Sequence, residues 1–355
     1  MLVINSRFLT QELTGVQRFA IELSLQLKQA MGDNVVFLTP HNVIHTDIAK
    51  QLSARITGTH TGHLWEQADL PRQLKKMGNP LLLCFGNTAP IFYGNKIDTL
   101  HDITFVRYPH TFSPKFLYFY RLIIPLIVRT SKHLFTVSEF SKSEIVAHYH
   151  IAPEKISVIY NAVNPIFQPV KDEKLADEKY IIAVSSMKEN KNFAVAYQAY
   201  KIARRQIDGL KLYIIGDVRS GNFKGMDGFI SELNADEGVR ILGRISDDDL
   251  IRYYSNARAF LFPSLYEGFG IPVLEAQSCR CPVIAAASSS LPEVLGNSAL
   301  LCNPNNPQEF ADAICRIIND ESFGKELVKA GEENLKRFSW GKSASKILHI
   351  IQTMK

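Results

Sequence analysis

Two carboxylates flank a glycine-bearing loop in residues 264–276, which read SLYEGFGIPVLEA. Glu267 precedes the glycines, and Glu275 follows it by eight residues. The stretch lies between an apolar, strand-like run at 259–263 and a helix that Pro272 is suited to open. A strand, a glycine loop and a helix N-terminus together point backbone N–H groups at an anion. Two acids beside such an anion seat favour a nucleotide-sugar site.

The elements that would position this loop follow an alternating pattern. Short apolar runs alternate with helical-period stretches along the chain, which is typical of parallel sheets covered by helices on both faces. We expect strands at residues 2–5, 35–39, 81–85, 99–101, 133–137 and 157–160 in the first half. In the second half we expect them at 180–184, 211–215, 240–242, 259–263 and 282–286.

Residues 161–174 contain two prolines followed by a charge run, and they make the best linker in the chain. The sequence therefore predicts an α/β fold of two doubly wound, Rossmann-like domains that face each other across a cleft, where a ligand is expected. The predicted domains are residues 1–165 and 166–338. The apolar helix expected within residues 339–355 would cross back to the first domain.

Length and composition limit the class of protein. A chain of 355 residues, 46% hydrophobic and 21% charged, suits an ordinary soluble protein of two domains. No charged region followed by an apolar core opens the chain, so we expect a cytoplasmic protein. The cysteines suit neither a disulfide framework nor a zinc ribbon, and we expect them to be reduced core residues. They are Cys84, Cys279, Cys281, Cys302 and Cys315.

Charge is distributed unevenly along the chain. Residues 1–170 hold 16 Lys and Arg against 11 Asp and Glu, a net charge of +5, and the remainder is neutral. A basic first half suits anionic substrates or an anionic membrane face, whereas no nucleic-acid-binding signature is present. The longest apolar run, 116–128, is interrupted by Arg121 and Pro125 and is too short to span a bilayer. It predicts a helix buried in the core, with a surface that dips into lipid headgroups as the alternative.

Taken together, these motifs resemble the retaining glycosyltransferases of the GT-B type, in particular the large group with a Glu-x7-Glu signature (glycosyltransferase family 4, group 1). The likeness rests on the signature at 267–275 and on the downstream run at 291–294, LPEV. Weaker matches are Thr14–Arg18, His101-Asp102, Val137–Glu139, Asn161–Val163, Lys191-Asn192 and Gly243. The resemblance covers nearly the whole chain, and it is closest to bacterial mannosyl- and related transferases that build surface polysaccharides such as lipopolysaccharide.

The resemblance implies a role for each matched residue. The donor-binding residues would be Gly15, Lys191, Gly243, Gly268, Phe269, Gly270, Ile271 and Glu275. Glu275, expected in the first turn of the helix that follows the glycine loop, would accept hydrogen bonds from the ribose hydroxyls; an acid that only complements the helix dipole is the alternative. Lys191 would meet the diphosphate as a point charge. His101, Asp102 and Glu267 would lie nearest the reacting sugar as the catalytic residues.

The chemistry of such a reaction requires groups of this kind. A nucleotide diphosphate gains negative charge as its bond to the sugar breaks, so cations and N–H donors must point at the phosphates. No cofactor and no metal are expected beyond the GDP- or UDP-linked sugar itself, since backbone dipoles and Lys191 would take the place of a metal. The acidic run Asp247-Asp248-Asp249 is instead predicted to begin a helix.

Four further residues are weaker candidates. Arg18 would face either the phosphates or solvent. Asn161 would help to shape the cleft at its hinge. Ser138 and Glu139 follow another predicted strand.

One position departs from the family pattern. Where relatives place an arginine after the first strand of the second domain, this chain has Ser186 or Asn190. Lys191, with Lys188 or Arg18, is then left to neutralise the diphosphate.

We therefore expect a hexosyltransferase that moves a hexose, with mannose from GDP-mannose as the first choice, onto a lipid-linked or oligosaccharide acceptor with retention of configuration. The basic N-terminal domain would give peripheral contact with the inner membrane at its cytoplasmic face. UDP- or dTDP-sugars are alternative donors. An epimerase or phosphorylase on the same fold, and a non-catalytic nucleotide-sugar-binding assembly subunit, are alternative functions.

Overall fold

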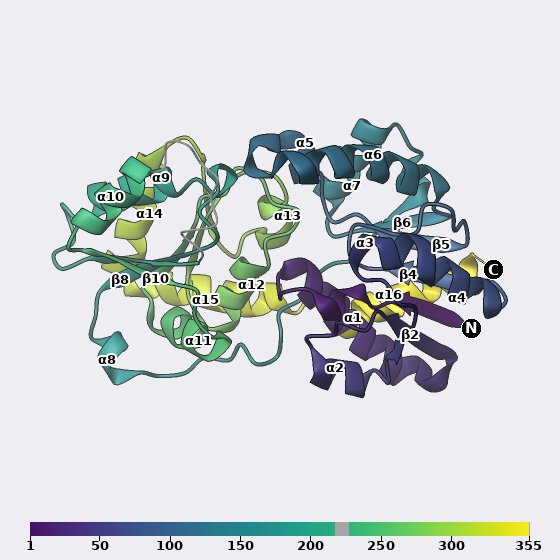
Figure 1. Cartoon of the computed structure of the whole chain (residues 1–355). Helices are drawn as coiled ribbons and strands as arrows, with labels where there is room; N and C mark the ends of the chain where they lie inside the picture. Colours follow the sequence, from purple (N-terminus) through teal and green to yellow (C-terminus); the bar gives the residue numbers. More distant parts are fainter. Residues whose placement is uncertain (217–226, 355) are drawn as a thin grey trace. The chain divides into compact units, whose positions relative to one another are not determined.

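The chain forms two compact units in the computed structural model, which describes residues 1–216 and 227–354 (Figure 1). Unit 1 comprises residues 1–103, 114–161 and 339–355, and unit 2 comprises residues 104–113 and 162–338. The predicted division after residue 165 placed residues 104–113 in the first domain, whereas their contacts assign them to unit 2. Each unit is built around its own parallel sheet.

Unit 1 contains a seven-stranded parallel sheet in the order β3-β2-β1-β4-β5-β6-β7. Its strands are β1 (Leu2–Asn5), β2 (Val35–Thr39), β3 (Arg55–Ile56), β4 (Leu81–Cys84), β5 (Lys96–Thr99), β6 (His133–Thr136) and β7 (Ile156–Val158). β1 and β2 are buried along their whole length, as expected for the central strands of a sheet covered on both faces.

The helices of unit 1 cover this sheet. They are α1 (Gly15–Met31), α2 (Thr46–Gln51), α3 (Gly62–Leu64), α4 (Leu70–Lys76), α6 (Pro114–Thr130), α7 (Glu139–Tyr149) and α16 (Trp340–Thr353). α1 buries Phe19, Leu23 and Leu27, which share one helix face at intervals of four residues. α16 lies beside α1, where the Trp340 ring meets Phe19 at a centroid distance of 6.1 Å. The C-terminal helix therefore completes the core of unit 1.

Unit 2 contains a six-stranded parallel sheet in the order β10-β9-β8-β11-β12-β13. Its strands are β8 (Tyr180–Val184), β9 (Lys211–Ile215), β10 (Val239–Gly243), β11 (Ala259–Phe262), β12 (Val283–Ala286) and β13 (Leu300–Cys302). Its helices are α5 (Thr104–Arg107), α8 (Glu173–Ala176), α9 (Phe193–Ala203), α10 (Asp227–Ala235), α11 (Asp247–Asn256), α12 (Ile271–Ser278), α13 (Leu291–Leu295), α14 (Pro307–Asn319) and α15 (Glu321–Leu335). The prediction of two parallel-sheet α/β domains is confirmed.

The prediction for β5 was wrong in position. We placed a strand at 99–101, but β5 runs from Lys96 to Thr99, and all four of its residues are buried. The sequence Lys-Ile-Asp-Thr hides this strand because Lys96 and Asp98 break the apolar run. The Lys96 ammonium is nevertheless satisfied in the interior, because it donates to the carbonyls of Ile91 (3.3 Å) and Tyr93 (2.9 Å) and to Thr130 Oγ1 (2.8 Å). β3 and β13 were not predicted, since each has at most three residues.

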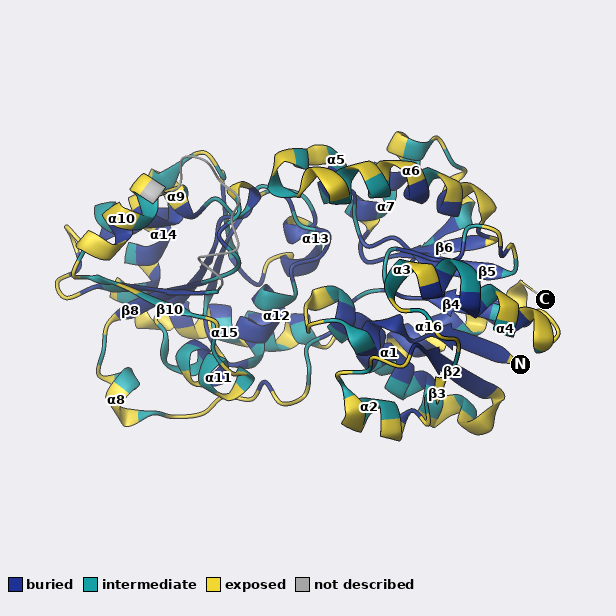
Figure 2. Cartoon of the chain, in the orientation of Figure 1, coloured by how far each residue is buried: buried dark blue, intermediate teal, exposed yellow. Residues whose placement is uncertain are grey.

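The expectation that residues 116–128 form a helix buried in the core was half right. They lie within α6, whose Ile123, Ile124, Ile127 and Val128 are buried. Its other face is exposed (Figure 2). Among the described residues, no helix is long and apolar enough to cross a bilayer.

The buried carboxyl group of Asp98 in β5 should make the stability of the protein depend on pH. Burial, reinforced by the nearby charge of Glu66, raises the pKa of Asp98 to about 8. The folded state thus binds more protons than the unfolded chain between about pH 4 and about pH 8, so this group's contribution to stability falls as pH rises through that window. Asp98→Asn removes the titration. The stability of the variant relative to wild type should rise by about 1 kcal/mol or more from pH 5 to pH 8 in urea unfolding.

The matched control is Asp47→Asn, since the Asp47 side chain is 88% exposed. It measures the effect of an Asp→Asn change at an exposed position under the same conditions. A pH-independent difference for Asp98→Asn would contradict a raised pKa.

Candidate active site

The two loops with the strongest sequence signals leave adjacent strands of unit 2. β8 pairs with β9 on one side and with β11 on the other, so the strand order reverses between β8 and β11. Ligands of open parallel sheets bind at the carboxyl ends of strands where the order reverses in this way. The loop after β8 carries Lys191, and the loop after β11 carries Glu267.

Lys191 and Glu267 form an ion pair. Lys191 Nζ lies 2.7 Å from Glu267 Oε1, and the two side chains are only 18% and 12% exposed. The sequence-based prediction gave the two residues separate roles, with Lys191 at the phosphates and Glu267 at the sugar. The structure brings them together as an ion pair, so an anion that approaches Lys191 would share its ammonium with the carboxylate.

A second contact between the same loops comes from Asn190. Its side-chain Nδ2 donates to the Tyr266 carbonyl (3.2 Å), and its own carbonyl accepts from the Leu265 N–H (2.7 Å). Asn190 is 3% exposed. The residue expected to stand in place of a family cation is therefore a buried tether between the loops, and Ser186 lies in the turn before it, where its carbonyl accepts from the Lys188 N–H (2.8 Å).

Three consecutive serines that the sequence reading missed hold the Glu267 loop from the other side. Ser289 Oγ accepts from the Glu267 N–H (3.0 Å), and Ser290 Oγ donates to the Glu267 carbonyl (3.0 Å). Ser288 Oγ donates to the Ser264 carbonyl (2.7 Å). These serines follow β12, the neighbour of β11. A polar triplet just after an apolar run was the available signal.

The glycine loop ends at the N-terminus of α12. Gly270 has φ of +92° and a Cβ there would lie 2.9 Å from Leu291 Cδ2, so the position favours glycine. Gly270 has no side chain to cap the helix. Pro272 has no N–H and the Val273 N–H donates to the Gly270 carbonyl (3.2 Å), so the Ile271 N–H is the first backbone donor of the helix that can meet an anion. Gly268 is buried in this loop. The Phe269 ring packs on Phe338 at 5.5 Å, so this residue can offer a ligand only its backbone.

Glu275 is the fifth residue of α12, not a first-turn residue as expected from the sequence. It is only 7% exposed. Its carboxylate is close enough to Tyr254 and Cys279 to help burial raise the pKa of both groups. A carboxylate that only complements the helix dipole acts from the first turn of the helix. Because Glu275 lies in the second turn, that alternative role is less favoured.

Gly243 ends β10 with φ of +68°, and its carbonyl accepts from the Gly216 N–H (2.8 Å). It lies at the same carboxyl edge as the loops after β8 and β11. Downstream, Ser246 caps α11 by accepting from the Asp249 N–H (3.1 Å). The acidic run Asp247–Asp249 thus begins a helix, as predicted, and among the described residues no three His, Cys, Asp or Glu side chains gather as metal ligands.

Residues 104–113, which come from the first half of the sequence, pack against this site. The Tyr108 ring lies 5.9 Å from that of Tyr266, and Lys188 Nζ lies 4.9 Å from the centre of the Phe112 ring. His110 Nε2 lies 2.5 Å from Glu189 Oε2. All three contacts fall on the two loops that bear Lys191 and Glu267. Sequence reasoning missed this segment because nothing local marks it as part of unit 2.

In unit 1, His101 lies two residues beyond β5 and is 7% exposed. Its Nε2 donates to the Phe85 carbonyl (2.9 Å), and its ring meets Phe19 edge-on at 4.9 Å. A carbonyl can only accept, so Nε2 carries the proton and Nδ1 is left as an acceptor. Burial also lowers the pKa of His101, which keeps the ring neutral at pH 7. Asp102 follows it, half-buried, and its charge favours the protonated ring.

The strand order of unit 1 also reverses, between β1 and β4. There Arg7 Nε lies 3.2 Å from Glu66 Oε1, and Arg7 Nη2 donates to Thr88 Oγ1 (2.9 Å). Asn5 Nδ2 donates to the same Glu66 oxygen (2.7 Å). Burial raises the pKa of Glu66, but the Arg7 charge and a bond from His63 outweigh it and bring the pKa to about 2. The sequence reading missed this buried network, whose members lie far apart in the chain.

Three further candidate site residues of unit 1 lie at the starts of helices. Gly15 is the exposed first residue of α1, where Thr14 bonds the Gln17 side chain and makes no side-chain cap. Ser138 caps α7 by accepting from the Ser141 N–H (3.0 Å), with Glu139 as the first helical residue.

Asn161 and Arg18 complete the weaker candidates. Asn161 is 3% exposed, and within the described part of the chain its Oδ1 has no hydrogen-bond partner. Arg18 is half-buried in the first turn of α1.

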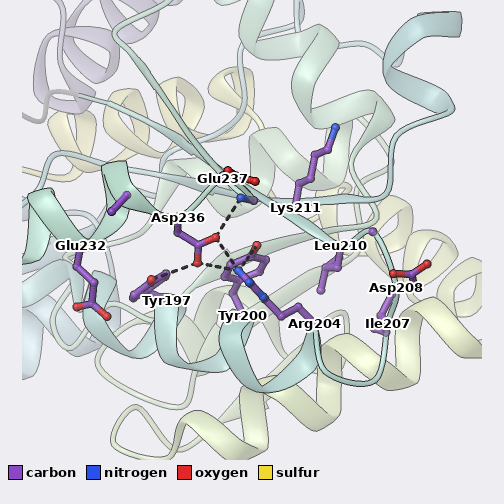
Figure 3. Close-up of a pocket in the computed structure, with 13 residues that line it drawn as sticks. Tyr197, Tyr200, Arg204, Ile207, Asp208, Leu210, Lys211, Glu232, Asp236 and Glu237 are labelled. Carbon is purple, nitrogen blue, oxygen red and sulfur yellow. Dashed lines mark hydrogen bonds and ion pairs between the residues drawn. The ribbon is translucent and has the colours of Figure 1, made fainter.

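A cavity of 790 Å³ opens at the other edge of the unit 2 sheet, where β9 and β10 begin (Figure 3). Two of its charged groups, Arg204 and Asp236, bond each other. Arg204 Nη1 donates to both oxygens of Asp236 (2.6 and 2.7 Å), and Asp236 also accepts from Tyr197 Oη (3.2 Å). Because ligands of such sheets bind at the carboxyl edge, this cavity is not the candidate site.

Comparison with known proteins supports the same two-part organisation. Residues 13–166 match the family described as Glycosyltransferase Family 4, and residues 167–334 match that described as Glycosyl transferases group 1. The O-antigen chain mannosyltransferase RfbU of Salmonella typhimurium is 34% identical over 246 residues, which are 69% of this chain and 67% of that protein. The O-antigen chain mannosyltransferase B of Escherichia coli is 28% identical over 253 residues, which are 69% of this chain and 66% of that protein.

A solved structure gives the same fold over almost the whole chain. Anabaena HepE in complex with UDP and glucose superimposes with a TM-score of 0.75, covering 99% of both chains. The two sequences are only 17% identical, so this likeness concerns the fold alone.

The packing of residues 104–113 on the site predicts an effect of His110. His110→Ala removes the contact with Glu189, so the 3-10 turn Glu189–Lys191 should open more often. Hydrogen–deuterium exchange should show at least threefold faster exchange of the Lys191 and Asn192 amides, whose bonds close that turn. His41→Ala, an exposed histidine elsewhere in the chain, is the control. Unchanged exchange in the His110 variant would show that the segment does not hold the loop.

Proposed function

The chain belongs to the glycosyltransferases that combine a family 4 domain with a group 1 domain, and we propose that it transfers a hexose from a nucleotide sugar to a lipid-linked or oligosaccharide acceptor with retention of configuration. The observation that carries the proposal is the Lys191–Glu267 pair at the strand-order reversal of unit 2. It places a cation and a carboxylate beside the uncapped N-terminus of α12. These are the groups that a sugar attached to a diphosphate requires.

Each group has one task in this proposal. The Ile271 N–H at the start of α12 and the Lys191 ammonium bind the diphosphate. Glu275 accepts hydrogen bonds from the ribose hydroxyls. Once the phosphates attract Lys191, the Glu267 carboxylate can turn to the sugar hydroxyls and oppose positive charge at the anomeric carbon. The two residues thereby exchange partners when the donor binds.

His101 and Asp102 act on the sugar in the same proposal. The His101 ring is held by Phe85 and is neutral, so its Nδ1 can accept a hydrogen bond from a sugar hydroxyl. A neutral acceptor adds no positive charge beside a developing cation. Asp102 would orient the ring or contact the acceptor.

The reaction breaks the bond between the anomeric carbon and the phosphate oxygen and forms one from that carbon to an acceptor oxygen on the same face. The departing phosphate oxygen takes the acceptor's proton, so no separate general base is needed. Lys191 and the Ile271 N–H stabilise the charge that collects on the diphosphate as the bond breaks.

We favour mannose from GDP-mannose as the donor, because both O-antigen relatives are mannosyltransferases by name. A UDP-linked or dTDP-linked sugar is the alternative on the same fold. A lipid-linked acceptor would bring the protein to the cytoplasmic face of the membrane. A non-catalytic nucleotide-sugar binder is the second functional candidate, because Ser186 or Asn190 stands where the family pattern has an arginine, and Asn190 is buried.

A panel of nucleotide sugars separates these alternatives. A donor that binds the native state should raise the melting temperature, and GDP-mannose should raise it most. Addition of an acceptor extract should then release the nucleotide diphosphate. Stabilisation by a donor without release or transfer would favour the non-catalytic binder. Isomerisation of the donor without an acceptor would favour an epimerase.

Glu275→Ala tests the ribose contact. The variant should bind both the nucleotide diphosphate and the complete donor about tenfold or more weakly, since a charge-assisted hydrogen bond to ribose contributes about 1.5–3 kcal/mol. Isothermal titration calorimetry measures both affinities. Glu321→Gln, an exposed change on α15, is the control. Retained affinity for the nucleotide would reject the ribose assignment.

The ion pair makes opposite predictions for its two members. Lys191→Met should weaken binding of the nucleotide diphosphate about tenfold, because a cation at the phosphates is lost. Glu267→Gln should leave that affinity unchanged or raise it, because the carboxylate no longer competes for the ammonium, while the rate of transfer falls. Equilibrium binding and single-turnover kinetics give the two quantities. Weaker nucleotide binding in both variants, by similar factors, would contradict the exchange of partners.

A further inference from the structure

We propose that His63 of unit 1 positions the acceptor saccharide by accepting a hydrogen bond from one of its hydroxyls at Nε2. The proposal rests on the proposed function and adds to it a residue that acts on the acceptor. His63 lies in α3, and its side chain is 39% exposed. Behind it lies Glu66, whose side chain is 1% exposed. A partly exposed histidine that is oriented by a buried carboxylate is typical of rings that act on a ligand.

The contact between these two side chains fixes which ring nitrogen carries the proton. His63 Nδ1 lies 3.4 Å from Glu66 Oε2. Burial opposes ionisation of Glu66, but the charge of Arg7 and the bond from His63 bring its pKa to about 2. The ionised carboxylate can only accept, so a neutral His63 donates from Nδ1 and is an acceptor at Nε2. Among the described residues Glu66 is the only hydrogen-bond partner of the ring, which leaves Nε2 for a ligand.

A π-helical turn, Trp65–Asp69, holds Glu66 in place between α3 and α4. Single turns of π-helix are rare and occur frequently at functional sites. Trp65 Nε1 donates to the Thr57 carbonyl (2.6 Å) in the loop after β3. Gln67 bonds the loop after β4 through both ends of its amide, each at 2.9 Å. The turn is therefore anchored on two sides, and the carboxylate behind His63 is fixed with it.

The position of Glu66 in the sheet also favours a ligand site. Glu66 Oε1 accepts from Asn5, the last residue of β1, and from Arg7 in the segment that follows. These contacts lie at the carboxyl edge of the sheet, where the strand order reverses between β1 and β4. Ligands of open parallel sheets bind at such a reversal. His63 is therefore oriented by a carboxylate that lies where a ligand of unit 1 is expected.

Aromatic side chains of α6 complete the surroundings of His63. The Phe119 ring lies 4.4 Å from the His63 ring, and Phe119 is half-buried, as is the neighbouring Tyr120. Burial raises the pKa of Tyr120 to about 12, and the charges of both Glu66 and Asp102 add to that rise. Tyr120 thus lies within electrostatic range of Asp102, which is proposed to act on the sugars. Partly exposed aromatic rings beside a few fixed polar groups are what a small-molecule site requires.

Two substitutions of His63 separate hydrogen bonding from packing. His63→Phe keeps a ring against Phe119 but has no acceptor, whereas His63→Gln offers an amide oxygen near the place of Nε2. His63→Phe should raise the KM for the acceptor about tenfold, since one hydrogen bond is lost, and His63→Gln should stay within about threefold of wild type. The KM for the donor and the affinity for the nucleotide diphosphate should stay within about twofold in both variants.

The probes are the octyl glycosides of mannose, galactose and N-acetylglucosamine. Initial rates at saturating donor give the KM for each glycoside that wild type accepts. Saturation-transfer NMR compares binding of the same glycosides to wild type and variants without any transfer. An unchanged KM and unchanged binding in His63→Phe, or a smaller loss in His63→Phe than in His63→Gln, would assign His63 to packing and overturn the proposal.

His60 provides a matched control. Its side chain is 40% exposed, and its Nδ1 lies 3.0 Å from Asp69 Oδ1, so it is also a partly exposed histidine paired with a carboxylate. Asp69, however, bonds the N–H groups of residues 59 and 60 and lies 3.7 Å from Arg72, and it does not bond β1. His60→Phe should leave the KM for the acceptor within about twofold. A rise equal to that of His63→Phe would contradict a specific role for His63.

The role of Glu66 has a spectroscopic test. Nitrogen-15 NMR at pH 8 should show the His63 ring protonated at Nδ1 and unprotonated at Nε2, with the signal identified by its absence from His63→Gln. In Glu66→Gln the carbonyl takes the place that faces Asn5 and Arg7, so the amide NH₂ faces His63 and moves the ring proton to Nε2. That variant should raise the KM for the acceptor as much as His63→Phe. A wild-type ring protonated at Nε2 would overturn the proposal, whether or not transfer is observed.

These measurements distinguish failure of this inference from failure of the proposed function. The melting temperature of each variant reports whether it folds, and the wild-type spectrum with the His63 variants decides the test where Glu66→Gln does not fold. A wild-type protein that transfers sugar to no acceptor contradicts the proposed function. A wild-type protein that transfers sugar, with an unchanged KM for the acceptor in His63→Phe, contradicts only the role of His63.

Discussion

The reversal of strand order between β8 and β11 is the constraint on which the site depends. Because the two parallel strands are neighbours, the loops after their carboxyl ends must meet, although 76 residues separate Lys191 from Glu267. An ion pair, the Asn190 tether and the serines after β12 then fix the loops to each other. Without that reversal, the α12 N-terminus would have no cation beside it. The order of the strands in the unit 2 sheet is thus what brings these charged groups together.

Much of the fold could be predicted because strands buried on both faces are apolar runs. β1 and β8 are of this kind, and both were placed correctly from the sequence. β5 was misplaced because its Lys96 and Asp98 are polar residues whose burial is stabilised by partners distant in the sequence. The hydrophobic periodicity of a sequence indicates which positions are buried, but it does not identify the distant partners that stabilise a buried polar residue. The missed residues 104–113 have the same cause, since their contacts with Tyr266 and Glu189 are not local.

The types of the site residues could be predicted from the sequence, but their contacts with one another could not. The Glu-x7-Glu spacing located Glu267 and Glu275, but the pairing of Glu267 with Lys191 and the burial of the Phe269 ring required coordinates. The same holds for the buried network of Arg7, Glu66 and Thr88 in unit 1. In each case the residue types could be read from the sequence, but which residues contact each other is known only from the fold.

The composition of unit 1 has a consequence for the order in which the protein is made. Residues 339–355 belong to unit 1, and α16 covers Phe19 through Trp340. A ribosome therefore synthesises all of unit 2 before it supplies the last helix of unit 1. Until that helix is available, unit 1 exposes part of the apolar face of α1. The first unit in the sequence is consequently the last to be completed, and it is the one exposed to premature association while the chain is still attached to the ribosome.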